Sequence, residues 1–126
     1  MLVLDSGGLS RLAERSQSAA ALILALRRNG LWPPVVVTPV LVESLTGDGG
    51  RDALVNRLLK TCNVAEEVGE RLARRAAFLR TAARRGSAVD ALVVAVAEPH
   101  GSVLTSDSAD LEALAAHARN VSVEAV

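Results

Sequence analysis

The sequence predicts an α/β domain in which helices cover both faces of a mostly parallel sheet of four to five strands. Three short apolar runs, Leu2–Leu4, Val35–Val37 and Ser102–Thr105, have the length and residue types of buried strands. Longer segments of helical periodicity separate them. Strands that alternate with helices are typical of a three-layer α/β/α arrangement. The 126 residues fit one such domain, which we expect to span residues 1–126.

In the first half of the chain, turn and cap signals separate two strands from several helical segments. Ser6, Gly7 and Gly8 predict a turn after the first strand. Thr38 and Pro39 predict a helix start, with Thr38 as the N-cap and Pro39 at the first helical position. The helices expected here cover residues 9–13, 18–28, 38–47 and 51–60.

In the second half, a long amphipathic helix is expected over residues 66–84, ended by Gly86. Ser87 then caps a very apolar helix over residues 88–98. The remaining elements expected are an edge strand at 62–64, a helix over 107–118 and a last strand at 121–123.

The composition argues against several classes of function. Basic and acidic residues balance at 14 each, which does not indicate a general DNA-coating protein. One Trp, one Phe and no Tyr offer no aromatic platform for stacking single-stranded bases. The only cysteine, Cys62, cannot form an internal disulfide, so we expect a cytoplasmic protein. No apolar stretch is long enough to span a membrane, and no signal peptide is visible.

Four acidic residues, Asp5, Glu43, Asp90 and Asp107, lie at the edges of segments predicted to be buried. Buried carboxylates are costly unless they are paired, hydrogen-bonded or bound to a metal. Asp5 and Asp107 directly follow strands, and the carboxyl ends of parallel strands border the functional crevice of such folds. Carboxylates favour hard cations such as Mg²⁺ or Mn²⁺, which organise water for attack on a phosphate. The four acids together predict phosphodiester hydrolysis.

Each acid also has a local structural explanation. Asp5 fits a turn or a helix cap, and Glu43 fits an ordinary exposed helix position. Ser87 and Asp90 have the spacing of a capping box, although Glu or Gln is its usual second member. Asp107 is a plausible N-cap for the helix that follows it. Capping and catalysis are compatible, because a carboxylate at a helix start can also point into a cleft.

The chain as a whole resembles the PIN-domain ribonucleases, and most of all the VapC-type toxins of type II toxin–antitoxin pairs. The resemblance rests on LDSGGLSRL, TPVLVESL and SAVDALVVAVAEPHGSVLTSDSADL, in this order. It implies a PIN-like three-layer fold and a Mg²⁺- or Mn²⁺-dependent endoribonuclease that cleaves RNA. It also implies a homodimer and inhibition by a cognate VapB-type antitoxin.

The resemblance also implies roles for individual residues. Asp5, Glu43 and Asp90 would form the core of the metal cluster. Asp107 would complete the cluster, and Asp110 is a second candidate for this fourth acid.

Two further positions match the family and one departs from it. The hydroxyls of Ser6 and Thr105 match polar positions that orient the acids. The Gly7-Gly8 pair is a departure, since larger residues are common there, and it could alter the wall of the cleft or loosen the first helix.

Six arginines lie between Arg71 and Arg85, and Arg71, Arg74 and Arg75 are candidate contacts for RNA or for an antitoxin. The alternative is a solvated helix face. An alternative function is a catalytically inactive PIN-like module that binds RNA or a protein. A phosphorylated signalling domain is disfavoured because the only lysine, Lys60, lies in a predicted helix away from the strand ends.

Overall fold

The computed structural model describes residues 1–126 and contains one five-stranded sheet in which every neighbouring pair of strands is parallel. The strand order is β3-β2-β1-β4-β5. The strands are β1 (Leu2–Leu4), β2 (Val35–Val37), β3 (Asn63–Ala65), β4 (Ser102–Thr105) and β5 (Ser122–Ala125). The helices are α1 (Ser6–Ala13), α2 (Gln17–Arg28), α3 (Thr38–Ser44), α4 (Ala53–Leu59), α5 (Glu70–Ala83), α6 (Ala88–Ala97) and α7 (Ala109–Ala115). The predicted α/β class is therefore confirmed.

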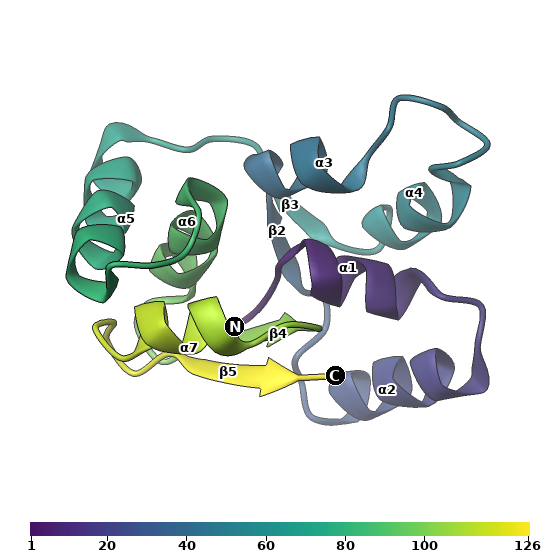
Figure 1. Cartoon of the computed structure of the whole chain (residues 1–126). Helices are drawn as coiled ribbons and strands as arrows, with labels where there is room; N and C mark the ends of the chain where they lie inside the picture. Colours follow the sequence, from purple (N-terminus) through teal and green to yellow (C-terminus); the bar gives the residue numbers. More distant parts are fainter.

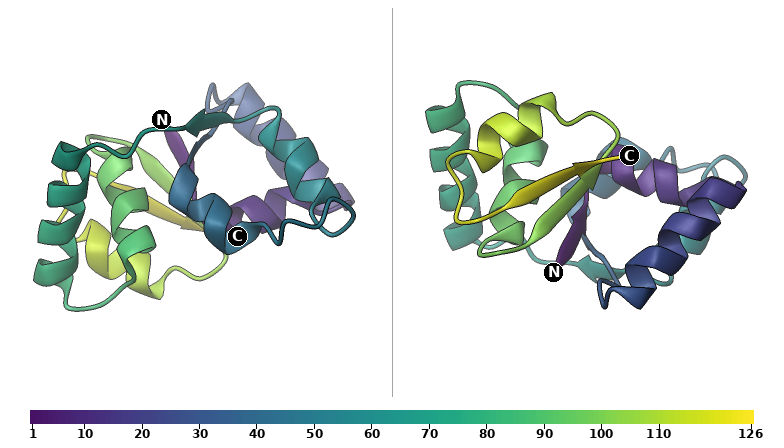
Figure 2. Two further views of the ribbon diagram at one scale, coloured as in Figure 1. Left: turned by 90° about the horizontal axis from the view of Figure 1, so that it is seen from above. Right: turned by 90° about the horizontal axis from the view of Figure 1, so that it is seen from below.

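The helices form two layers, one on each side of the sheet. Helices α5, α6 and α7 gather on one side, while α1, α2 and α4 lie on the other (Figures 1 and 2). Helix α6 lies against the central strands β1, β2 and β4. The crossover from β3 to β4 passes through α5 and α6, so α6 runs back toward the amino ends of the strands. Its first turn consequently lies at the carboxyl end of the sheet.

The core is aliphatic and sits on both faces of the central strands β1, β2 and β4. Val3, Leu4 and Val103 are almost completely buried, as are Val93 and Val94 on the inward face of α6. Burial of such side chains contributes about 1.5–3 kcal/mol each, which explains how a domain almost without aromatics forms a core. No helix combines the length and the apolar character that crossing a membrane requires.

Several predicted boundaries were wrong at the starts of helices. Ser6, Gly7 and Gly8 belong to α1 and do not form a turn, because Asp5 caps the helix directly after β1. Thr38 is the first residue of α3, and Val37 holds the N-cap position without a side-chain hydrogen bond. The long predicted helix begins only at Glu70.

The Gly7-Gly8 pair lets α1 approach the end of β4 closely. A Cβ atom at Gly8 would overlap the carbonyl oxygen of Leu104 and would also crowd the Asp5 carboxylate. A Cβ at Gly7 would overlap the Ser106 side chain. The expectation that these glycines loosen the first helix is therefore not met, because they allow its first turn to pack on the strand end.

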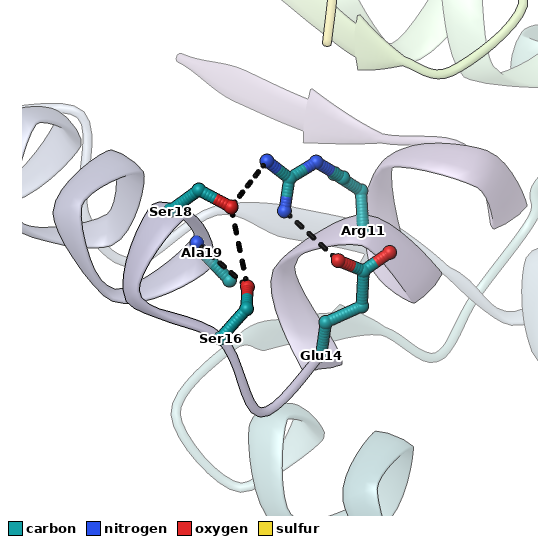
Figure 3. A network of polar contacts seen from close by, with 5 residues as sticks. All are labelled: Arg11, Glu14, Ser16, Ser18 and Ala19. Atoms are coloured by element: carbon teal, nitrogen blue, oxygen red, sulfur yellow. Dashed lines mark hydrogen bonds and ion pairs between the residues drawn. The ribbon is translucent and has the colours of Figure 1, made fainter.

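The connection between α1 and α2 is fixed by a small polar network, drawn in Figure 3. Arg11 donates to Glu14 at 3.0 Å and to the Ser18 hydroxyl at 3.0 Å. Ser16 is the N-cap of α2 and accepts from the backbone N–H of Ala19 at 3.1 Å. These contacts hold the tight turn between two helices that would otherwise be joined only by residues 14–16.

We predict that Gly8→Ala destabilises the protein although alanine is the better helix former. The overlap with the Leu104 carbonyl forces α1 away from β4, and such overpacking costs about 1–3 kcal/mol. Gly49→Ala is the matched control, because a Cβ there meets nothing within 4 Å. Urea denaturation measures both free energies of unfolding. Equal stability of the two variants would contradict the proposed role of Gly8.

Candidate active site

The four predicted acids come from four separate elements at the carboxyl end of the sheet. Asp5 follows β1, and Asp107 follows β4, the strand that pairs with β1. Glu43 lies in α3, which begins directly after β2. Asp90 lies in the first turn of α6.

Asp5 is the most constrained of these acids. Its side chain is 9% exposed, and its Oδ1 accepts the backbone N–H of Gly8 at 2.7 Å. Its Oδ2 accepts the hydroxyl of Thr105 at 2.6 Å, and Thr105 is completely buried. The hydroxyl that orients Asp5 is therefore that of Thr105, while Ser6 is the half-buried first residue of α1.

The acids influence one another electrostatically. Burial raises the pKa of Asp5, and the negative charges of Asp90 and Asp107 raise it further, against the hydrogen bonds from Thr105 and Gly8. Partial burial, Asp90 and Asp5 raise the pKa of Glu43 in the same way. Asp5 therefore lies within electrostatic reach of Asp90 and Asp107, and Glu43 lies within reach of Asp90 and Asp5.

Asp90 takes part in a helix cap and can also contribute to the site. Its Oδ2 accepts the backbone N–H of Ser87 at 3.1 Å, and its own N–H donates to the Ser87 hydroxyl at 3.0 Å. The predicted capping box is thus present. A carboxylate has about four lone-pair sites, so Asp90 keeps acceptor capacity for a cation or a further donor.

The two candidates for the fourth acid differ in their surroundings. Asp107 is exposed in the loop after β4, and its backbone N–H donates to the Thr105 hydroxyl at 3.1 Å. The prediction that Asp107 caps the next helix was wrong, because α7 begins at Ala109 and Ser108 holds the N-cap position. Asp110 forms an ion pair with Arg85 at 2.7 Å, so its carboxylate already has a cationic partner.

The donor chemistry of the site suits a hard divalent cation. All four side chains offer carboxylate oxygens, which such cations prefer as ligands. Their mutual repulsion would be relieved by a positive charge. The side chains do not form a finished ligand shell, since no three His, Cys, Asp or Glu residues lie together closely enough to hold a metal ion.

The predicted arginine contacts lie far from these acids. Arg71, Arg74 and Arg75 occupy the first half of α5, which packs against the last turn of α6. Arg75 marks this end, because it forms two 2.7 Å hydrogen bonds to Glu98 at the C-cap of α6. Asp90 and Glu98 are eight residues apart, roughly 12 Å along the helix. Arg74 pairs with Glu70 within α5, at 2.7 Å.

A groove that sequence reasoning missed lies between α1, α2 and α4, with a volume of about 410 Å³. Its apolar lining includes Leu12 and Leu58, and Arg15, Arg27 and Arg57 also border it. No local sequence motif predicts this groove, because its walls come from three helices. The apolar positions of these helices are divided between the core and the groove, and sequence periodicity does not separate the two.

We predict that Thr105→Val destabilises the protein by about 1.5–3 kcal/mol at pH 7, because it leaves a buried carboxylate oxygen without its donor. Thr105→Ser keeps the hydroxyl and is the matched control. The Thr105 hydrogen bond lowers the pKa of Asp5, so it favours the ionised form. The difference in the free energy of unfolding between Thr105→Val and Thr105→Ser should therefore be largest above the pKa of Asp5. It should shrink as the pH falls through that pKa. Urea denaturation at several pH values measures this, and a pH-independent difference would contradict the assignment.

No protein-family model and no curated protein matches the sequence. The fold is similar to that of a chain in the crystal structure of FitAcB from Neisseria gonorrhoeae, with a TM-score of 0.64. The alignment covers 98% of this chain and 96% of that chain, with 18% sequence identity. At this identity the likeness concerns the fold alone, which is α/β with an all-parallel five-stranded sheet.

Proposed function

We propose that this protein is a Mg²⁺- or Mn²⁺-dependent endoribonuclease that acts as the toxin of a toxin–antitoxin pair and cleaves RNA phosphodiesters. The observation that carries the proposal is the position of the four acids at the carboxyl end of a parallel sheet, where burial and neighbouring carboxylates raise the pKa values of Asp5 and Glu43. The resemblance of LDSGGLSRL and SAVDALVVAVAEPHGSVLTSDSADL to PIN-domain ribonucleases supports the same function.

In this proposal Asp5, Glu43 and Asp90 would hold the cation, and Asp107 would be the fourth acid. Asp107 is preferred to Asp110 because Arg85 occupies the Asp110 carboxylate. A bound Mg²⁺ or Mn²⁺ supplies an activated water and neutralises charge that develops on the phosphate.

The other side chains of the site hold these acids in place. Thr105 and the Gly8 N–H fix both oxygens of Asp5, and Ser87 fixes Asp90. These contacts reduce the rearrangement that the acids would need around a ligand.

We expect the protein to cleave RNA only when Mg²⁺ or Mn²⁺ is present, and Asp5→Asn and Asp90→Asn to lower the rate by more than about 100-fold. Glu112→Gln is the matched control, since Glu112 is an exposed acid on α7 outside this cluster. Gel analysis of labelled RNA, with and without EDTA, gives the rates. The acidic-site assignment is wrong if the folded Asn variants cut as fast as the natural protein.

Metal binding separates this proposal from the alternative of an inactive binding module. A cation that binds only the folded state raises the melting temperature by mass action. We expect Mg²⁺ or Mn²⁺ to raise it in the natural protein and in Glu112→Gln, and to have little effect in Asp5→Asn. Titration calorimetry should give the same ranking. Absence of any carboxylate-dependent binding would favour the inactive RNA- or protein-binding module.

The toxin part of the proposal requires a VapB-type antitoxin, and the groove between α1, α2 and α4 is the surface we assign to it. Its apolar lining and the arginines at positions 15, 27 and 57 suit an amphipathic segment with acidic side chains. The same proposal includes a homodimer, which light scattering would detect.

Co-expression with the product of the neighbouring reading frame tests the antitoxin assignment. We expect the two proteins to purify together and RNA cleavage to be inhibited. Arg57→Glu should weaken this complex by reversing one charge of the groove, while Lys60→Glu, one turn further along and not part of the groove lining, should not. If Arg57→Glu and Lys60→Glu retain the partner equally well, the antitoxin binds to another surface.

A further inference from the structure

The turn between α5 and α6 carries the arginine that is best placed to meet a substrate. Gly86 and Ser87 wrap around Asp90: a Cβ at Gly86 would lie 3.8 Å from the Cβ of Asp90, and the Ser87 N–H binds its carboxylate. Arg85 directly precedes these residues. Its side chain crosses to α7, where its Nε donates to Oδ1 of Asp110 at 2.7 Å. The backbone of Arg85 thus precedes the first turn of α6, and the ion pair directs its side chain toward α7.

The partner of Arg85 brings it toward the fourth acid as well. Asp110 lies in the first turn of α7, three residues after Asp107. The Arg85–Asp110 pair thus joins the turn before α6 to the first turn of α7, which follows the loop with Asp107. By contrast, Arg80 gives its Nε–H to the Gly86 carbonyl at 3.2 Å and so braces the turn.

The guanidinium of Arg85 keeps most of its binding capacity. An arginine has five N–H donors, and the hydrogen bond to Asp110 uses only the one on Nε. The side chain is 55% exposed, so the donors on Nη1 and Nη2 face solvent or a ligand. Two parallel donors of this kind match a phosphate group.

The site carries a high density of negative charge. The four acids come from elements at the carboxyl end of the sheet. An RNA backbone brings more negative charge to the same place, and one divalent cation offsets only part of four carboxylates. A fixed arginine at the rim would attract the backbone and set its position.

We propose that Arg85 binds an RNA phosphate next to the one that is cleaved, and that Asp110 holds Arg85 in position for this contact. The inference rests on the proposed ribonuclease function and names a positioning residue for it. It also gives Asp110 a role that differs from metal binding. An exposed ion pair contributes little to stability, so both residues can be changed without loss of the fold.

The test measures binding of a fluorescein-labelled single-stranded RNA of randomised sequence to the full chain carrying Asp90→Asn, which prevents cleavage. Addition of Arg85→Ala should weaken binding by about tenfold, as expected for loss of roughly 1.4 kcal/mol. It should also lower the slope of log affinity against log salt by about one, because one phosphate contact is lost. Arg85→Lys keeps the charge, so its RNA affinity should lie between those of the parent protein and Arg85→Ala.

Arg28→Ala is the matched control. Arg28 ends α2, and the chain then enters β2 at its amino end. Arg28 therefore lies toward the amino ends of the strands, away from the four acids at their carboxyl ends. It should leave both the affinity and the salt slope unchanged. If Arg85→Ala behaves like Arg28→Ala while the parent protein binds RNA, the role of Arg85 is refuted and the proposed function stands. If the parent protein neither binds nor, with Asp90 restored, cleaves RNA, both proposals fail.

Discussion

The hydrogen bond between Thr105 and Asp5 is the interaction around which the site is built. Only three polar or charged side chains, Asp5, Thr105 and Asp52, are buried in the protein. Asp52 is satisfied locally by the backbone and hydroxyl of Thr46 and by the Gly47 N–H. Asp5 instead takes its second partner from the adjacent strand, 100 residues further along the chain. A buried carboxylate without that donor would be costly. Loss of this contact would therefore destabilise the fold and disturb the site at the same time.

The close packing of α1 on β4 makes this contact geometrically available. The β1–β4 pairing sets Leu4 beside Leu104, and the next residue of each strand is Asp5 or Thr105. Gly8 then allows the first turn of α1 to approach the Leu104 carbonyl and offers its N–H to Asp5. A larger residue would move the helix start outward and leave Asp5 with one donor fewer. Gly8 is thus needed both for the position of the Asp5 carboxylate and for the packing of α1.

The sequence was sufficient for the fold class and for the placement of Asp5 and Asp107 just after two strands. It was insufficient wherever a long-range contact decides between local alternatives. Ser6 and Thr105 looked equivalent as orienting hydroxyls, and only the pairing of β1 with β4 separates them. Asp107 and Asp110 likewise share a helix-start pattern, and the ion pair that distinguishes their surroundings comes from Arg85, 25 residues before Asp110. Local patterns specify elements, whereas these choices depend on which elements become neighbours.

The acids also explain why local and functional interpretations of this sequence overlap. Asp5 is the N-cap of α1, and Asp90 closes the capping box of α6, so each stabilises a helix start near the positive end of its dipole. The same backbone N–H groups hold the carboxylates in place and partly offset their mutual repulsion. Truncation to alanine would remove the cap and the charge together, whereas asparagine keeps an acceptor for the cap. The amide variant therefore isolates the charge, which is the property that metal binding and RNA cleavage would require.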